Sequence, residues 1–311
     1  MNHKRKYAVM TAVSAILLML FAVLGQAAPA VTDADDKSGA VTESAAVQMT
    51  DGITAAADSS ENNAKSGSSV KKFFNNWLPY LVAGIANGGQ YALIAIGYTM
   101  VYGILRLINF AHGDIFMCAG LMMVYFSASL NIFISIPLVL ILTVLLGFLV
   151  ERLAYKPLRE APRMSVMISA IGVSYLLQNL AFYVTSGLAK QYPVIPFLSN
   201  SVSIGSVQVK TVTVVTPFLT IILILLLQLL IKKTKIGMAM RAVSFDFETS
   251  RLMGVKINSV ISMTFIIGSF LAGVGSVMFF SAYTTVTPTV GAMPGLKAFV
   301  AAVFGGIGSV P

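Results

Sequence analysis

The chain is poor in charged residues, in cysteine and in histidine. Asp, Glu, Lys and Arg make up 11% of its 311 residues, against roughly 25% in ordinary soluble domains, and the mean hydropathy is +0.83. One cysteine, Cys118, leaves no disulfide within the chain and no cysteine cluster for a metal. Two histidines, His3 and His112, are too few for most zinc sites. These shortages favour a helical membrane protein without a metal site over a soluble enzyme.

The motifs of common catalytic sites are also missing. No G-x-x-x-x-G-K-S/T sequence occurs, so the chain does not hydrolyse ATP with a P-loop. The G-x-S-x-G motif is absent as well, and only five acidic residues follow residue 77, which disfavours paired catalytic carboxylates. We therefore expect no catalytic residues, no bound cofactor and no enzymatic activity in this chain.

The net charge of +9 does not indicate a nucleic-acid partner, because the positive residues are placed in loops. From residue 78 onward there are fourteen Lys and Arg residues, and ten of them lie in two loops, 151–163 and 232–258. Positive charge gathered in alternate short loops follows the positive-inside rule of membrane proteins. We therefore place both loops in the cytoplasm and expect a lipid bilayer, and no nucleic acid, as a partner.

Three regions differ in composition. Residues 1–30 combine a basic start, an apolar run and small residues, which predicts a signal sequence or an uncleaved N-terminal anchor. Residues 31–77 begin with an Ala-, Ser- and Asp-rich stretch, which predicts a disordered periplasmic tether. Residues 78–311 form the apolar core. The sequence stops soon after a glycine-rich turn at its end, so we expect the C-terminus to be truncated.

The core reads as an all-α membrane protein of several spans with discontinuous helices. Each complete apolar run approaches the roughly 20 residues that a spanning helix needs. Residues 185–210, between two of the runs, are expected to form an external loop with a short β-hairpin. The predicted runs are 78–104, 115–130, 132–150, 164–184, 211–231, 259–283 and, in part, 295–310.

The stretch 84–120 keeps polar residues and glycines within an apolar region. Ionisable residues in membrane segments are costly facing lipid and usually surround a pathway, and a helix can break where its backbone borders a cavity. The alternative is a simple turn between two spans, with Asp114 capping the second. We expect the translocation pathway or its gate to involve Asn87, Gln90, Asn109, His112 and Asp114.

The second basic loop is too apolar for a solvated linker. Residues 236–243 can form a helix, Asp246 can cap a second short helix, and Gly254 can end it. Phe245, Phe247, Leu252 and Met253 would then stay exposed, which favours docking into a partner. The alternative is an amphipathic helix lying on the membrane surface.

Several motifs occur together in order along 78–311. They are YALIAIGYTMVYGILRLINFAHGDIFMCAG (91–120), ERLAYKPLR (151–159), ISAIG (168–172), IGMAMRAV (236–243) and GLKAFVAAVFGGIGSVP (295–311). The ordered set closely resembles the bacterial permeases for branched-chain amino acids, and most of all the first of the two permeases that such importers pair.

This resemblance implies a multi-pass subunit of the bacterial inner membrane. It further implies a second permease, two cytoplasmic ATPase subunits that bind ATP, and a periplasmic binding protein carrying leucine, isoleucine or valine. Residues 237–256 match the cytoplasmic loop that meets the ATPase in the family. The coupling residues expected on this ground are Arg241, Phe245, Asp246, Phe247, Glu248, Leu252 and Gly254.

Two further expectations complete the sequence prediction. Gly305, Gly306 and Gly308 are expected to form a tight turn between half-helices. For function, two alternatives to branched-chain amino acid import stay open: an importer for urea or short amides, and an ion-coupled secondary transporter that uses Asp114 and His112 as a proton relay.

Overall fold

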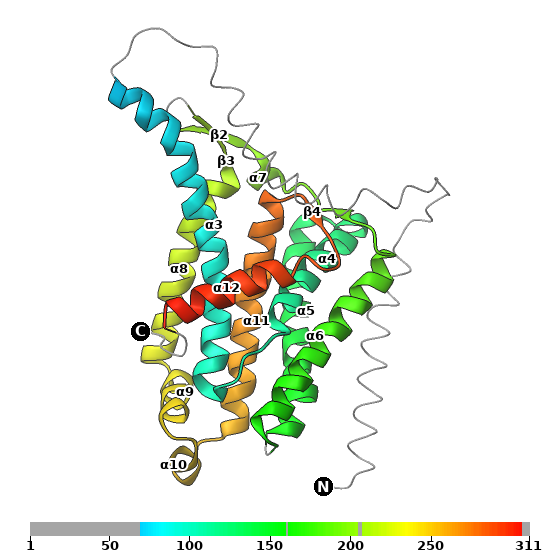
Figure 1. The fold of residues 1–311 in the computed structure, drawn as a ribbon, viewed down its shortest axis with the longest axis vertical. Helices are drawn as coiled ribbons and strands as arrows, with labels where there is room; N and C mark the ends of the chain where they lie inside the picture. Colours follow the sequence, from blue (N-terminus) through cyan, green and yellow to red (C-terminus); the bar gives the residue numbers. More distant parts are fainter. Residues whose placement is uncertain (1–68, 160, 205–206, 307–311) are drawn as a thin grey trace. The chain divides into compact units, whose positions relative to one another are not determined.

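Most of the apolar runs fold as long helices. The computed structural model describes residues 69–159, 161–204 and 207–306 (Figure 1). The predicted signal sequence or anchor, most of the predicted tether, and Gly308 lie outside the described residues. From Tyr80 onward the described residues belong to one compact unit, and the contacts given below lie within it.

The long helices lie close to the predicted segments, although the first begins at Ser69 rather than at residue 78. Their bounds are α3 (Ser69–Leu105), α4 (His112–Ser129), α5 (Ile132–Val150), α6 (Arg163–Thr185), α8 (Thr211–Lys233) and α11 (Ile257–Ala282). Three shorter helices are α9 (Lys235–Phe245), α10 (Phe247–Leu252) and α12 (Ala292–Phe304). A π-helical turn (Glu151–Tyr155) and a 3-10 turn (Lys156–Leu158) continue α5.

Four helices of the described chain are long and apolar enough to cross a membrane. They span Ile132–Leu158, Arg163–Thr185, Thr211–Lys233 and Ile257–Ala282. Helices α3 and α4, which we expected to span as well, are not among the four. Polar residues, such as Gln90 in α3 and Asp114 in α4, lower the mean hydropathy of every stretch of these two helices that is long enough to cross a membrane.

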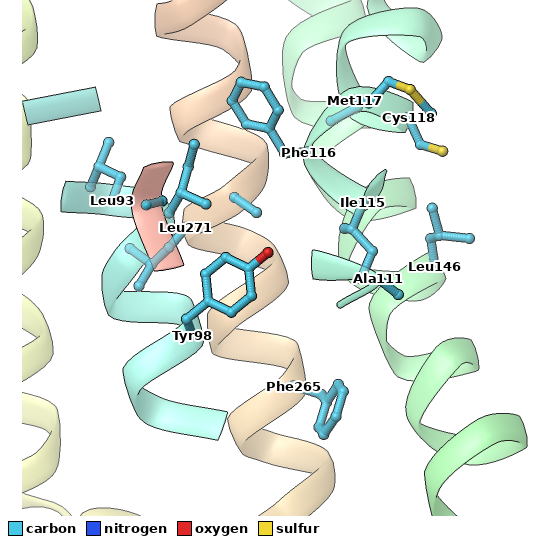
Figure 2. Packing of buried hydrophobic residues seen from close by; sticks show 14 of the residues in the cluster. Leu93, Tyr98, Ala111, Ile115, Phe116, Met117, Cys118, Leu146, Phe265 and Leu271 are labelled. Atoms are coloured by element: carbon cyan, nitrogen blue, oxygen red, sulfur yellow. The ribbon is translucent and has the colours of Figure 1, made fainter. Parts of the chain in front are cut away.

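Helices α4 and α11 lie in the interior, whereas α5, α6 and α8 expose apolar faces. In the most apolar 18-residue stretch of α11, 67% is buried inside the protein, whereas in the corresponding stretch of α8 only 22% is buried. The exposed apolar side chains of the outer helices, such as Ile141, Ile168 and Phe218, suit contact with lipid. Figure 2 shows α11 passing between Leu93 and Tyr98 of α3 and the α4 side chains Ile115 and Phe116.

Small residues let the interior helices approach closely. The sequence predicts such packing for the stripe Gly268, Ala272 and Ser276, and all three residues are buried in α11. A Cβ atom on Gly268 would lie 3.6 Å from the Cα of Gly97 in α3. A Cβ on Gly147 of α5 would collide with the Ser269 side chain. The predicted close packing of α11 is therefore confirmed.

Short strands and one short helix, α7 (Pro196–Ser199), fill the loop that follows α6. The predicted hairpin is confirmed: β2 (Ser201–Ile204) pairs antiparallel with β3 (Val207–Lys210). A second pairing was not foreseen, in which β1 (Lys190–Gln191) joins β4 (Thr285–Val286). This pair ties the loop after α6 to the loop after α11.

Candidate functional site

The polar stretch of the sequence contains a real break between two helices. Helix α3 ends at Leu105, and Arg106 has a φ of 52°, a left-handed value that is uncommon for a residue other than glycine. Helix α4 begins at His112, with Ala111 as its N-cap and no side-chain cap. Asp114 therefore does not cap α4, as the simple-turn alternative supposes, but lies in its first turn.

Asp114 instead binds side chains of α6. The hydroxyl of Ser174 donates a hydrogen bond to one carboxylate oxygen, and Nε2 of Gln178 donates to the other at 3.0 Å. Gln178 also donates to the Ser174 hydroxyl at 3.3 Å, so the three side chains form one network. Asp114 is only 2% exposed, and it forms no ion pair in the described part of the chain.

This network lines a cavity of about 250 Å³. The polar wall consists of Asp114, Ser174 and Gln178. The other walls come from the loop before α4, from Tyr98 of α3 and from the first turns of α12, and they are largely apolar. Those lining residues are Tyr98, Ile108, Phe110, Gly113, Gly291, Ala292, Gly295, Leu296 and Phe299.

Glycine contacts hold α12 against the first turn of α4 at the edge of the cavity. A Cβ atom on Gly113 would lie 2.6 Å from the carbonyl oxygen of Gly291 and 3.1 Å from the Cα of Gly295. Such distances to backbone atoms leave no room for a side chain. In Figure 1, α12 crosses α3, and the rings of Tyr98 and Phe299 join the two helices with centroids 6.0 Å apart.

Of the five residues predicted for the pathway, only Asp114 lines this cavity. Asn109 is buried and its Oδ1 accepts a hydrogen bond from Tyr155 at 2.9 Å. His112 is buried against the ring of Tyr98, with centroids 4.8 Å apart. Gln90 is buried in α3, and Oδ1 of Asn87 accepts a hydrogen bond from Tyr283 at 3.2 Å.

Three of these side chains keep a buried polar atom without a hydrogen-bond partner within the described ranges. The atoms are Oε1 of Gln90, Nδ2 of Asn109 and Nε2 of His112. Buried polar atoms are nearly always paired, because an unpaired one costs about 1–3 kcal/mol. Two of these unsatisfied atoms, those of Asn109 and His112, therefore lie at the start of α4, and the third lies in α3.

Ser174 and Gln178 were missed by reasoning from the sequence. They lie four residues apart, which places both on one face of α6, and they interrupt an apolar segment. That spacing was the available signal, since polar residues of a membrane helix usually face the protein interior.

A second buried carboxylate, Glu151, was also missed. It forms an ion pair with Arg159, which also donates to Asn258, and it accepts a hydrogen bond from Ser262 at 2.8 Å. These contacts fix the π-helical turn against α11. A neighbouring cavity of about 240 Å³ is lined by Ile104, Leu105, Leu107, Tyr155, Arg159, Ala161, Arg163, Val166 and Phe247.

The second basic loop forms the predicted pair of helices with the predicted caps. Asp246 accepts hydrogen bonds from the backbone N–H groups of Glu248 at 3.0 Å and Thr249 at 3.1 Å. The hydroxyl of Thr249 also donates to this carboxylate, and together these bonds lower the pKa of Asp246 below its ordinary value. Gly254 has a φ of 83° and ends α10, donating to the Arg251 carbonyl at 3.1 Å.

The apolar side chains of this helix pair are exposed, as the sequence predicts. Phe245 and Leu252 are each 86% exposed, and Met253 is 80% exposed. Phe247 is less exposed because it turns into the second cavity beside Arg159. Arg241 and Glu248 are exposed around these residues.

Comparison with known proteins identifies the class of protein. The sequence profile of the family described as "Branched-chain amino acid transport system / permease component" matches residues 80–311. The chain belongs to this family, so it is a multi-pass membrane transport subunit rather than an enzyme. This confirms the resemblance and the helical permease fold inferred from the sequence.

Individual relatives are similar over most of their length. The chain is 37% identical over 250 residues to the high-affinity branched-chain amino acid transport system permease protein BraD of Pseudomonas aeruginosa, covering 76% of this chain and 81% of BraD. It is 37% identical over 254 residues to LivH of Salmonella typhimurium and 36% identical to LivH of Escherichia coli, covering 76% of this chain and 82% of each relative. No solved structure matches at a significant level.

Proposed function

We propose that this chain is a membrane permease subunit of an ATP-driven, binding-protein-dependent importer of branched-chain amino acids. The observation that carries this proposal is the capped helix pair α9–α10, which presents Phe245, Leu252 and Met253 to the exterior. Family membership supports the transport role. Because the sequence has no P-loop, partner subunits supply ATP hydrolysis.

The helix pair fits a groove in a cytoplasmic ATPase partner. Large exposed apolar side chains that cluster on one feature mark protein interaction sites, and a short helix with apolar anchors is a common element for groove binding. The Asp246 cap and the Gly254 turn fix both ends of α10, so Leu252 and Met253 are presented in one orientation. Arg241 and Glu248 supply a polar rim around these anchors.

A shared cavity and one hydrogen bond lie between this surface and the start of α4. Phe247 of α10 lines the second cavity together with Tyr155 and Arg159. The Tyr155 hydroxyl donates to Asn109, three residues before α4 begins. A movement of α10 driven by the ATPase would therefore reach the loop beside Asp114 through Phe247, Tyr155 and Asn109.

We place the translocation pathway at the cavity beside Asp114. Asn109 and His112 hold the loop and first turn that form its edge, while Asn87 and Gln90 lie further along α3. The cavity is bounded by exposed residues of α12, among them Ala292 and Leu296. A second permease subunit facing this side would complete the pathway, and a periplasmic binding protein would deliver the amino acid to it.

Uptake of labelled leucine tests the proposal. Cells that lack this chain, and the same cells with it restored, are compared under ATP depletion and under collapse of the proton gradient. Uptake that needs the chain and ATP, with unlabelled valine competing, is the expected result. Loss only on gradient collapse would overturn the ATP-driven mechanism, and competition by urea but not valine would change the substrate class.

The docking surface is tested in the same cells with Leu252→Asp. A carboxylate at this exposed position opposes burial in an apolar groove, so the ATPase should no longer co-purify and uptake should be lost. The matched control is Phe197→Asp, which places a carboxylate on an exposed aromatic position of α7. Equal co-purification for both variants would contradict docking through α10.

A further inference from the structure

The two buried carboxylates whose surroundings the structure describes, Glu151 and Asp114, are compensated differently. Glu151 is 0% exposed and is paired with the guanidinium of Arg159. Asp114 is 2% exposed, and its partners are the neutral hydroxyl of Ser174 and the neutral amide of Gln178. Across the described ranges, no Lys or Arg forms an ion pair with Asp114.

A buried carboxylate without a cation is costly unless it has a strong compensating group. Its position in the first turn of α4 gives Asp114 some stabilisation from the helix dipole. Two neutral donors add to this, but an ionised carboxylate offers about four acceptor sites. Room therefore remains on Asp114 for a further, positively charged donor.

The cavity gives such a donor access. Asp114, Ser174 and Gln178 all line its about 250 Å³, so the carboxylate network faces a space rather than packed side chains. The lining also includes the large apolar side chains of Ile108, Phe110, Leu296 and Phe299. A molecule that filled this space would meet both a carboxylate and apolar side chains.

We infer that Asp114, with Ser174 and Gln178 holding it in place, is a binding subsite for the primary ammonium group of the transported molecule, and that the wall formed by Ile108, Phe110, Leu296 and Phe299 receives its branched aliphatic side chain. The identity of the amine rests on the proposed function. Asp114 contacts the ligand, whereas Ser174 and Gln178 position its carboxylate. An ammonium–carboxylate hydrogen bond is charge-assisted and therefore among the stronger ones in proteins.

The test measures direct binding to the assembled complex of both permeases and the ATPase subunits in lipid nanodiscs, without the binding protein. The probes are labelled leucine, 3-methylbutylamine, which keeps the ammonium and lacks the carboxylate, and 4-methylpentanoate, which keeps the carboxylate and lacks the ammonium. We expect the first two to bind and the third not to bind.

Asp114→Asn should lower the affinity for 3-methylbutylamine by roughly tenfold or more, the effect of losing one charge-assisted hydrogen bond. Gln178→Leu should lower it less, since the carboxylate remains. Ala292→Trp fills the cavity from α12 without changing the carboxylate, and it should also abolish binding, which places the ligand in this cavity. If Asp114→Asn does not assemble, the preference of the wild-type complex for 3-methylbutylamine over 4-methylpentanoate tests the role of the carboxylate. Ser276→Ala is the control, because Ser276 is buried in α11 and is not a cavity residue.

Equal affinity of wild type and Asp114→Asn for the amine would overturn the subsite. A wild-type complex that does not bind the amine, whether or not it binds 4-methylpentanoate, would overturn it as well. Leucine uptake in cells separates this result from the proposed function. Normal uptake with amine binding independent of Asp114 leaves the function standing and removes the subsite. If amine binding depends on Asp114 but the cells show no leucine uptake through this chain, the subsite stands and leucine is rejected as the transported substrate.

Discussion

The hydroxyl of Tyr155 donates a hydrogen bond to Oδ1 of Asn109 at 2.9 Å. Tyr155 ends the π-helical turn after α5, and Asn109 lies in the loop that leads into α4. Both side chains are buried. This single bond joins the segment beside the docking helices to the segment beside Asp114.

Removing this hydroxyl should uncouple the two segments. In Tyr155→Phe, Oδ1 of the buried Asn109 loses its donor, at a cost of about 1–3 kcal/mol. We expect ATP hydrolysis to continue while the leucine transported per ATP falls, as measured in proteoliposomes with the complete transporter. Tyr283→Phe is the matched control, since Tyr283 donates to the amide of Asn87 instead. An equal loss of transport in both variants would contradict a special role for the Tyr155 bond.

The buried ion pair should respond unequally to removal of its two members. Arg159→Met leaves the fully buried Glu151 without its counter-ion, and breaking a buried pair in this way costs about 3–5 kcal/mol. Glu151→Gln should cost less, because the side chain of Arg159 is 13% exposed and can reach water. Thermal unfolding of the purified transporter measures the order. A greater loss of stability in Glu151→Gln than in Arg159→Met would show that the partial exposure of Arg159 does not stabilise its unpaired charge.

Glycine at position 113 is needed for the close packing of α12 against α4. In Gly113→Ala the new methyl group would lie 2.6 Å from the carbonyl oxygen of Gly291, and overpacking of this kind costs about 1–3 kcal/mol. Helix α12 should shift and leucine uptake should fall at equal expression. Gly172→Ala in α6 is the control, because nothing lies within 4 Å of its added Cβ. Retained uptake in Gly113→Ala would show that α12 adapts to the extra methyl group.

The cap of α10 should depend on the side chain of Asp246 but not on pH in the neutral range. Its pKa is lowered in the folded protein, so the stabilising contribution is complete above the ordinary aspartate pKa of about 3.9 and is lost only as pH falls through the lower, folded value. Asp246→Ala should weaken ATPase co-purification and speed amide exchange at Glu248 and Thr249.

Asp246→Asn is the informative comparison, because asparagine is as good an N-cap as aspartate. It should retain co-purification at neutral pH. If Asp246→Asn behaved like Asp246→Ala, the charge of the residue, rather than its capping bonds, would be what the partner recognises.

Local features of the chain could be predicted from the sequence, and distant contacts could not. The caps of α10 were predictable because Asp246, Glu248, Thr249 and Gly254 lie within a few residues of one another. The hairpin of β2 and β3 was predictable for the same reason. The family resemblance, carried by motifs in order, was predictable as well.

The surroundings of Asp114 were not predictable in the same way. Its polarity in an apolar stretch marked it, but Ser174 lies 60 positions away, and only the packing of α6 on α4 brings the two together. The pairing of Glu151 with Arg159 depends on the π-helical turn, which changes the direction of the side chains that follow α5. The pair β1–β4 is too short to show in any sequence pattern.

The β1–β4 pair also has a consequence for the order in which the chain folds during synthesis. Residues of β1 leave the ribosome after α6, but their partners in β4 emerge only after α8, α9, α10 and α11 have been made. Contacts between distant segments form slowly, because the intervening chain must first be ordered. The β1 end of this loop therefore reaches its final pairing only after residues 285–286 have been made, whereas the β2–β3 hairpin in the same loop can form earlier.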